Sequence, residues 1–278
     1  MTVTGAIRKP AVAGMFYPAD KSSLTNAVDR LLAQAETMSL SGTAIAIIAP
    51  HAGYQYSGLT AAYAYLAARD TSFDTVVVVS PSHREYFDGI SVYGGSAYAT
   101  PLGEIGINED LREQLTSRDP IIEVSSAGHR AEHALEVQLP FVQRIRHNAT
   151  LLPIVMGDQR RPYCKHLGER LAAVLAGSRA LLVASSDLSH YHGYETANDL
   201  DRVVIDAVAG FDEMKLMDDL ESRRVEACGG GPMAAVMIAA RNLGATAAHV
   251  LHHCNSGDTG GDRDRVVGYL AASLHRSH

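Results

Sequence analysis

The sequence predicts an α/β fold in which helices flank a mostly parallel or mixed central sheet. The chain has 278 residues, of which 46% are hydrophobic and 20% charged. This is an ordinary globular composition, with enough chain to bury a sizeable core. Short uninterrupted apolar runs alternate along the chain with segments of helical periodicity. Because uninterrupted runs are typical of strands that are buried on both faces, this alternation favours a parallel or mixed sheet.

Five apolar runs predict buried strands. They are Ala44–Ala49, Thr75–Val79, Leu151–Val155, Ala180–Ala184 and Val266–Ala272. All are far shorter than the roughly 20 residues that a helix needs to span a membrane. We therefore expect strands of a buried sheet and no membrane-spanning segment.

Segments with apolar residues at helical spacing lie between these strands. They are Ser22–Ala35, Leu59–Ala68, Pro162–Leu175, Ala197–Val208 and Pro232–Leu243. A Ser at the start can cap a helix, and Pro is tolerated in the first turn because its missing N–H has no partner there. A further amphipathic segment, Glu132–His147, contains Pro140 and predicts two pieces or a kinked helix. No linker or repeat divides the chain, so we expect a single domain over residues 1–278.

Charge and cysteine content exclude several classes of function. The formal net charge of −7 argues against nucleic-acid binding, because that affinity comes from clustered Lys and Arg. Cys164, Cys228 and Cys254 form no CxxC pair, which is typical of reduced thiols. Met1–Pro10 has no apolar core of a signal peptide. We expect a cytoplasmic protein that acts on a small-molecule substrate, without nucleic acid or membrane.

Two of the 13 histidines follow predicted strands directly. His51 follows the strand Ala44–Ala49, and His83 follows the strand Thr75–Val79. Open α/β sheets bind ligands at the carboxyl ends of their strands, and imidazole suits Fe, Cu and Zn. The two residues therefore predict an imidazole pair from two neighbouring strands. A histidine that is hydrogen-bonded to loop backbone is the other interpretation of His51.

Polar residues at two further positions are candidates for chemistry. Asp187, three residues before His190, could hold that imidazole in one tautomer, or it could cap a following helix. Cys228 precedes three glycines and a predicted helix, whose start is expected to lower the pKa of the thiol. Cys228 is then a metal ligand, a nucleophile or a small buried residue. His133 could bind substrate or a proton, or form a salt bridge or cap.

Six segments together resemble the Memo-like family, in the family's order and almost end to end. They are Arg8–Pro18, Ala49–Tyr54, Ser80–His83, Glu132–Phe141, Ser185–His190 and Ala227–Gly229. The resemblance implies a fold similar to that of class III extradiol (LigB-type) dioxygenases, which bind Fe(II) through two His and a carboxylate. Bacterial and archaeal members are associated with an AMMECR1-like protein and a radical-SAM protein, which are therefore the implied partners.

The resemblance also implies a metal centre with two His and one Cys as ligands. In this sequence they are His51, His83 and Cys228. Fe(II) is the expected metal, with Cu as the alternative. A thiolate in place of the carboxylate departs from the dioxygenases and would change the affinity and redox behaviour of the metal.

The same resemblance assigns residues around the metal. Asp187 and His190 match the catalytic pair of the family's pocket, and Tyr56 matches its substrate-binding Tyr. An aromatic residue near the N-terminus matches either Phe16 or Tyr17, and both stay open.

Three functions follow from these residues. The first is a mononuclear metal-dependent redox enzyme, similar to extradiol dioxygenases, that acts on a small phenolic substrate. The second is a non-catalytic module that binds a peptide or a partner protein in the same pocket. The third is a hydrolase with Cys228 as nucleophile and His190 as base, which leaves His51 and His83 unexplained.

Overall fold

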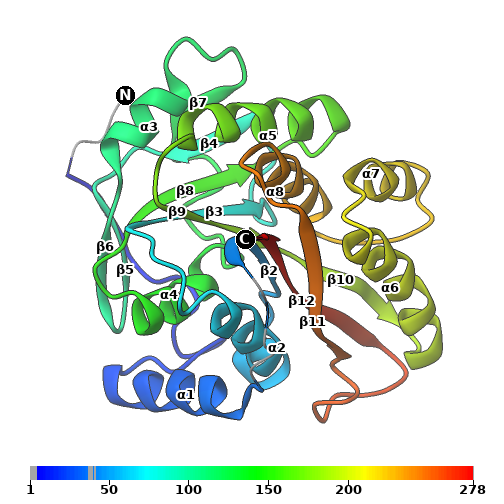
Figure 1. Ribbon diagram of the computed structural model, residues 1–278. Coiled ribbons are helices and arrows are strands. Elements are labelled where there is room, and N and C mark those ends of the chain that lie inside the picture. Colours follow the sequence, from blue (N-terminus) through cyan, green and yellow to red (C-terminus); the bar gives the residue numbers. More distant parts are fainter. Residues whose placement is uncertain (1–4, 37–39, 41, 278) are drawn as a thin grey trace.

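A central sheet with helices on both faces dominates the computed structural model, which describes residues 5–36, 40 and 42–277 (Figure 1). The predicted domain over residues 1–278 also includes residues 1–4, 37–39, 41 and 278, which lie outside the described residues. Within the described part of the chain, the main sheet has nine strands and a second sheet has three.

Four of the five predicted strands form the parallel centre of the main sheet. In their order across the sheet they are β2 (Thr43–Ala49), β9 (Ala180–Ser185), β3 (Thr75–Pro81) and β8 (Thr150–Met156). The fifth predicted strand, β12 (Val266–Arg276), pairs antiparallel with β2.

Further strands extend the main sheet on both sides. Beyond β12 lie β10 (Asp187–His192) and β11 (Ala247–Asn255), both antiparallel to β12. Beyond β8 lie β4 (Ile90–Tyr93), which is antiparallel to β8, and β7 (Ile122–Ser125), which is parallel to β4. The prediction of a mostly parallel or mixed sheet is confirmed, and the sheet is a mixed one.

The central strands bury side chains on both faces. In β3, Val77 and Val79 belong to one hydrophobic core, whereas Val76 and Val78 belong to the other. All four side chains are buried. Successive side chains of a strand point to opposite faces, and here each face meets a core. This is why the sequence of β3 is an uninterrupted apolar run.

Helices supply the outer layer of both cores (Figure 1). The first core takes residues from α3 (Glu109–Thr116), α5 (Arg161–Leu175), α6 (Tyr194–Ala209), α7 (Glu213–Glu221) and α8 (Gly230–Asn242). The second core takes residues from α1 (Lys21–Gln34), α2 (Tyr54–Ala67) and α4 (Leu139–Ile145). None of the helices in the described residues is long and apolar enough to cross a bilayer.

One helical segment begins earlier than predicted, and another has the predicted break. α2 begins at Tyr54 and not at Leu59, because Tyr54 packs in the core although Ser57 and Gly58 interrupt the apolar pattern of the sequence. The segment Glu132–His147 forms two pieces, as predicted. A short 3₁₀ helix, η1 (Glu136–Gln138), leads into α4, and Pro140 lies in the first turn of α4.

The second sheet places the start of the chain beside the main sheet. It consists of β1 (Ile7–Arg8), β5 (Ala97–Thr100) and β6 (Gly103–Gly106), with β1 parallel to β5 and β5 antiparallel to β6. From β1 the chain continues into the segment that contains Phe16 and Tyr17.

Candidate metal centre

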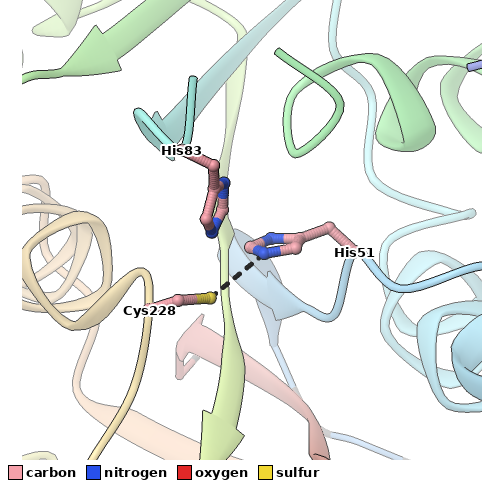
Figure 2. Close-up of side chains that lie close together, drawn as sticks. All are labelled: His51, His83 and Cys228. Carbon is pink, nitrogen blue, oxygen red and sulfur yellow. Dashed lines mark hydrogen bonds between the residues drawn. The ribbon is translucent and has the colours of Figure 1, made fainter. Parts of the chain in front are cut away.

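Three side chains from distant parts of the sequence converge at the carboxyl ends of the parallel strands. His51 follows β2, His83 follows β3, and Cys228 precedes α8 (Figure 2). One ligand atom of each residue lies within 4.8 Å of those of the other two, and His51 Nε2 is 3.1 Å from Cys228 Sγ. Bonds from a metal to N or S ligands measure about 2.0–2.3 Å. The three residues can therefore reach one ion with little movement.

The two histidines do not come from neighbouring strands, which corrects the prediction. β9 lies between β2 and β3. The prediction followed the order of strands along the chain, but β9 comes later in the sequence and is inserted between them. The imidazoles still meet across the end of β9, with ring centroids 5.2 Å apart.

A serine at the end of β9 orients His51. His51 Nδ1 is 2.9 Å from Ser185 Oγ, and that hydroxyl donates to the carbonyl of Ala134 at 2.7 Å. Since the hydroxyl has a single hydrogen, His51 Nδ1 must donate its own hydrogen to Ser185, which leaves the lone pair of Nε2 facing Cys228. Burial lowers the pKa of His51 well below its ordinary value. The imidazole is therefore neutral, which is the form that binds a metal.

Glu132 orients His83 and His133. Its Oε1 is 3.0 Å from His83 Nδ1 and 3.1 Å from His133 Nδ1, and the backbone N–H groups of both residues and of Ala134 donate to the same carboxylate. Burial raises the pKa of Glu132, but the contacts with the two imidazoles and the backbone N–H groups outweigh it, and the pKa lies well below its usual range. A charged carboxylate only accepts, so His83 Nδ1 donates and its Nε2 is available to a metal.

His133 and Phe16 lie beside the two candidate histidine ligands. The ring of His133 is 5.4 Å from that of His51 and 4.8 Å from that of His83, measured between centroids. The ring of Phe16 is 4.8 Å from that of His133. Of the two aromatic residues that the sequence left open, the structure thus places Phe16 next to the cluster.

Tyr17 helps to anchor the N-terminal segment. Its hydroxyl donates to Glu136, and burial together with that carboxylate raises the pKa of Tyr17. Glu136 also accepts hydrogen bonds from Arg8 NH1, from Ala11 N at 2.8 Å and from Val12 N at 3.1 Å. These bonds fix the segment that carries Phe16 against His133.

Asp187 and His190 lie in β10, and their hydrogen bonds differ from the predicted ones. The carboxylate of Asp187 accepts from the backbone N–H of His51 at 2.7 Å, and His190 Nδ1 lies 2.8 Å from the carbonyl of Leu188. A spacing of three residues puts two side chains on one face of a helix but not of a strand. The alternative of a helix N-cap is also wrong, because Asp187 begins a strand.

The environments of Asp187 and Tyr56 bear on their predicted roles. Asp187 Oδ2 is 4.0 Å from His51 Nε2, and burial raises the pKa of Asp187. Tyr56 is half-buried in the first turn of α2, in the helix that follows His51.

The thiol of Cys228 lies just before α8. Its sulfur accepts a hydrogen bond from the backbone N–H of Asp187 at 3.3 Å. Burial, followed by the charge of Asp187, raises the pKa of the thiol, so the expectation that the start of the helix would lower it is wrong. Desolvation of a thiolate here outweighs the hydrogen bonds that would lower the pKa. A Cβ at Gly229 would overlap the carbonyl oxygen of Ser185. Glycine therefore allows the start of α8 to lie directly against the end of β9.

Ser185, Glu132 and Gln138 were missed as site residues. Gln138 Nε2 donates to Ser185 Oγ at 2.8 Å and to the carbonyl of Pro50 at 3.0 Å. The sequence holds a signal for Ser185, which directly follows a predicted strand. It holds another for Glu132, which directly precedes His133. Gln138 offers a third signal, because it is a buried amide within an apolar segment.

These observations define a class of protein: an α/β fold with His, His and Cys side chains gathered at the carboxyl edge of a mixed sheet. Comparison with known proteins gives the family. The Memo-like protein family matches residues 8–273, and the chain belongs to this family, as the resemblance predicted.

Named relatives agree with the family. The chain is 38% identical over 268 residues to a MEMO1 family protein of Methanosarcina mazei, covering 95% of this chain and 98% of that protein. It is 34% identical over 270 residues to a MEMO1 family protein of Nitrosopumilus maritimus, again covering 95% of this chain and 98% of that protein. Its fold is similar to the crystal structure of an uncharacterized protein of Escherichia coli K12, with a TM-score of 0.52, 14% identity, and 82% and 98% of the two chains covered. At that identity the likeness shows the fold alone.

Proposed function

We propose that this Memo-like protein is a mononuclear metal-dependent redox enzyme that acts on a small phenolic substrate. Its ligands would be His51, His83 and Cys228, with Fe(II) as the metal and Cu as the alternative. One observation carries the proposal: both imidazoles turn Nε2 toward the sulfur while each Nδ1 faces a fixed acceptor. Histidine ligands in metal sites are typically oriented in this way.

A bound Fe or Cu ion would supply Lewis acidity and one-electron redox chemistry. A cation beside Cys228 would also favour the thiolate over the thiol, against the effect of burial. Two imidazoles and one thiolate leave coordination positions for a small chelating substrate.

The surrounding side chains would bind the substrate and move its protons. Phe16 offers an aromatic surface against which a phenolic ring can pack. His133 Nδ1 faces Glu132, so Nε2 is the atom that would accept a substrate proton. His190 would do the same through Nε2, because its Nδ1 is held by the carbonyl of Leu188.

Asp187 and Tyr56 complete the proposed set. The buried carboxyl of Asp187, whose pKa is raised, would hold a proton close to His51. The hydroxyl of Tyr56, in the first turn of α2, would bind a polar group of the substrate.

Metal analysis of anaerobically purified protein tests the proposed ligands. The unmodified protein should contain about one iron per chain, and a His51→Ala, His83→Ala double variant and Cys228→Ser should contain far less. His147→Ala removes an exposed histidine and should keep its iron. Full stoichiometric iron in the double variant would overturn the proposal. Loading the same variants with copper tests the alternative metal.

Oxygen consumption with catechol and related phenols tests the redox chemistry. Metal-loaded protein should consume oxygen only when a phenol is present, and His190→Ala should slow the reaction while keeping the metal. Fully loaded protein that consumes no oxygen with any phenol would contradict the proposed substrate class.

The geometry disfavours a Cys hydrolase. The imidazole in contact with Cys228 is that of His51, not that of His190. A nucleophilic thiol also needs a lowered pKa, whereas burial raises the pKa of Cys228.

Association with an AMMECR1-like protein and a radical-SAM protein rests on the family alone, and co-purification of the three proteins would test it.

A further inference from the structure

A cavity of about 460 Å³ lies at the carboxyl ends of β4 and β7. Its walls include residues 8–11, 93–95 and 124–126 together with Arg130, and none of the three candidate metal ligands. We call it the β4–β7 pocket. Because β4 and β7 are parallel to each other and β4 is antiparallel to β8, their carboxyl ends lie at the edge of the main sheet where the central strands begin. Its volume falls within the range of about 300–1,000 Å³ that small-molecule sites have.

The β4–β7 pocket combines apolar walls with cations at its rim. Tyr93, Val124 and Pro10 contribute ring and aliphatic surface. Lys9 is exposed and has no ion-pair partner among the residues that the structure describes. Arg130 is 63% exposed and pairs with Glu85 at 3.1 Å. Lys9 is thus unpaired among the described residues, whereas Arg130 donates to both carboxylate oxygens of Glu85.

The charge of Arg8, by contrast, is already used inside the protein. Its guanidinium donates to the carboxylate of Glu136, to the carbonyl of Glu132 and, at 3.0 Å, to the carbonyl of His129. The net positive charge that a ligand in the β4–β7 pocket would meet therefore comes from Lys9.

Two serine hydroxyls in the wall can each donate a hydrogen bond. Ser125 Oγ accepts from the N–H of Ala127 at 3.1 Å, and Ser126 Oγ accepts from Arg130 NH1 at 3.4 Å. Since each oxygen accepts in these contacts, its own hydrogen is left to donate. At Gly95 a Cβ would overlap the carbonyl oxygen of Ala6. Glycine therefore allows the start of the chain to close one side of the pocket.

We propose that the β4–β7 pocket binds a small anion with an apolar body, such as an aryl phosphate ester or an aromatic carboxylate. Lys9 pairs with the charge, and Ser125 and Ser126 donate to its oxygens. The apolar body lies against the aromatic and aliphatic wall. This site is separate from the proposed metal centre and does not depend on a bound metal.

An NMR titration of the full ¹⁵N-labelled chain with phenyl phosphate tests the proposal. The amide signals of Gly94 and Gly95 should shift and saturate, while those of Gly229–Gly231, beside the metal ligands, should not. Inorganic phosphate carries the charge without the apolar body, and phenol carries the apolar body without the charge. Each should bind at least about tenfold more weakly than phenyl phosphate. Benzoate distinguishes a preference for carboxylates from one for phosphate esters.

Two charge-reversal variants locate the binding site. Lys9→Glu changes an exposed residue of the pocket and should weaken phenyl phosphate binding about tenfold or more. Lys21→Glu makes the same change on an exposed residue of α1 and should bind like the unmodified protein. Equal affinity in Lys9→Glu, shifts only at Gly229–Gly231, or no saturable shift at millimolar phenyl phosphate would each overturn the proposal.

Discussion

At the scale of single residues, the orientation of each candidate histidine ligand depends on one acceptor. Ser185 accepts from His51 Nδ1, and Glu132 accepts from His83 Nδ1. Both residues were missed because Ser and Glu are common, although Ser185 directly follows a predicted strand and Glu132 directly precedes His133. His51 and His83 could be paired from the sequence, because both follow strands at positions where ligands bind. Cys228 was added as a third ligand only by the family resemblance.

We predict that Ser185→Ala weakens metal binding by about 10–100-fold, because His51 Nδ1 loses its acceptor. The free energy of unfolding should also fall by about 1–3 kcal/mol, because the carbonyl of Ala134 loses its donor. Titration against a chelator measures the first effect, and urea unfolding measures the second. Ser273→Ala removes a buried hydroxyl that has no hydrogen-bond partner among the described residues, and it should leave metal affinity unchanged. Undiminished affinity in Ser185→Ala would contradict the proposed orientation.

His129 is a buried histidine outside the metal centre. Its Nδ1 accepts from the hydroxyl of Tyr98 at 2.6 Å, and its Nε2 donates to the carbonyl of Ser91 at 3.2 Å. Burial lowers the pKa of His129 to about 3. The ring is therefore neutral in the folded protein at all but strongly acid pH.

This lowered pKa predicts a loss of stability in acid. Between pH 6.5 and pH 3, the unfolded chain binds a proton at His129 that the folded chain does not, so unfolding becomes more favourable as the pH falls. From pH 7 to pH 5, His129 should lower the free energy of unfolding by about 2 kcal/mol. Urea unfolding at the two pH values measures the change. The loss should be smaller in His129→Gln, and an equal loss in that variant would refute this assignment.

At the scale of elements, the segment before α1 is held in place by a helix far along the chain. Glu136 of η1 accepts from Arg8, from Tyr17 and from two backbone N–H groups between them. The side chains of Arg8 and Glu136 are both buried. If one of them is removed, water cannot solvate the charge of the other.

We predict that Glu136→Ala lowers the free energy of unfolding by about 3–5 kcal/mol, because it leaves the charge of Arg8 buried and unpaired. The released segment around Phe16 should also become sensitive to protease. Glu113→Ala removes an exposed carboxylate from α3 and should change neither property. Urea unfolding and limited proteolysis are the measurements. A loss below about 1 kcal/mol would show that the anchor is unimportant.

The sequence predicts some strands of the main sheet better than others. The central strands are apolar on both faces, and that pattern is unmistakable in β2, β3, β8 and β9. Four-residue strands such as β7 carry too little pattern, because their pairing depends on neighbouring strands.

At the scale of the whole molecule, the sheet was predicted but not its strand order. A sequence gives the order of strands along the chain, and β9 takes a place in the sheet that this order does not reveal. Its insertion between β2 and β3 puts Ser185 next to His51. The contacts that orient the ligands depend on this topology and were therefore beyond the reach of the sequence.

A bound ion should stabilise the entire chain. If Fe(II) binds only the folded protein, the free energy of unfolding should rise by about 2.7 kcal/mol at an ion concentration one hundred times Kd. Anaerobic thermal unfolding with Fe(II) and with EDTA measures the difference. The difference should vanish in Cys228→Ser and persist in His147→Ala. A large Fe(II) effect in Cys228→Ser would mean that the ion binds elsewhere.

The separation of the candidate ligands along the chain has a consequence for how the protein matures. His51 and Cys228 are 177 residues apart, and Arg8 and Glu136 are 128 apart. Contacts between such distant residues require the closure of long loops and slow the folding of a chain. The start of the chain leaves the ribosome long before Cys228 is made. If the three residues bind one ion, as proposed, the complete site therefore forms only after nearly the whole protein has been made.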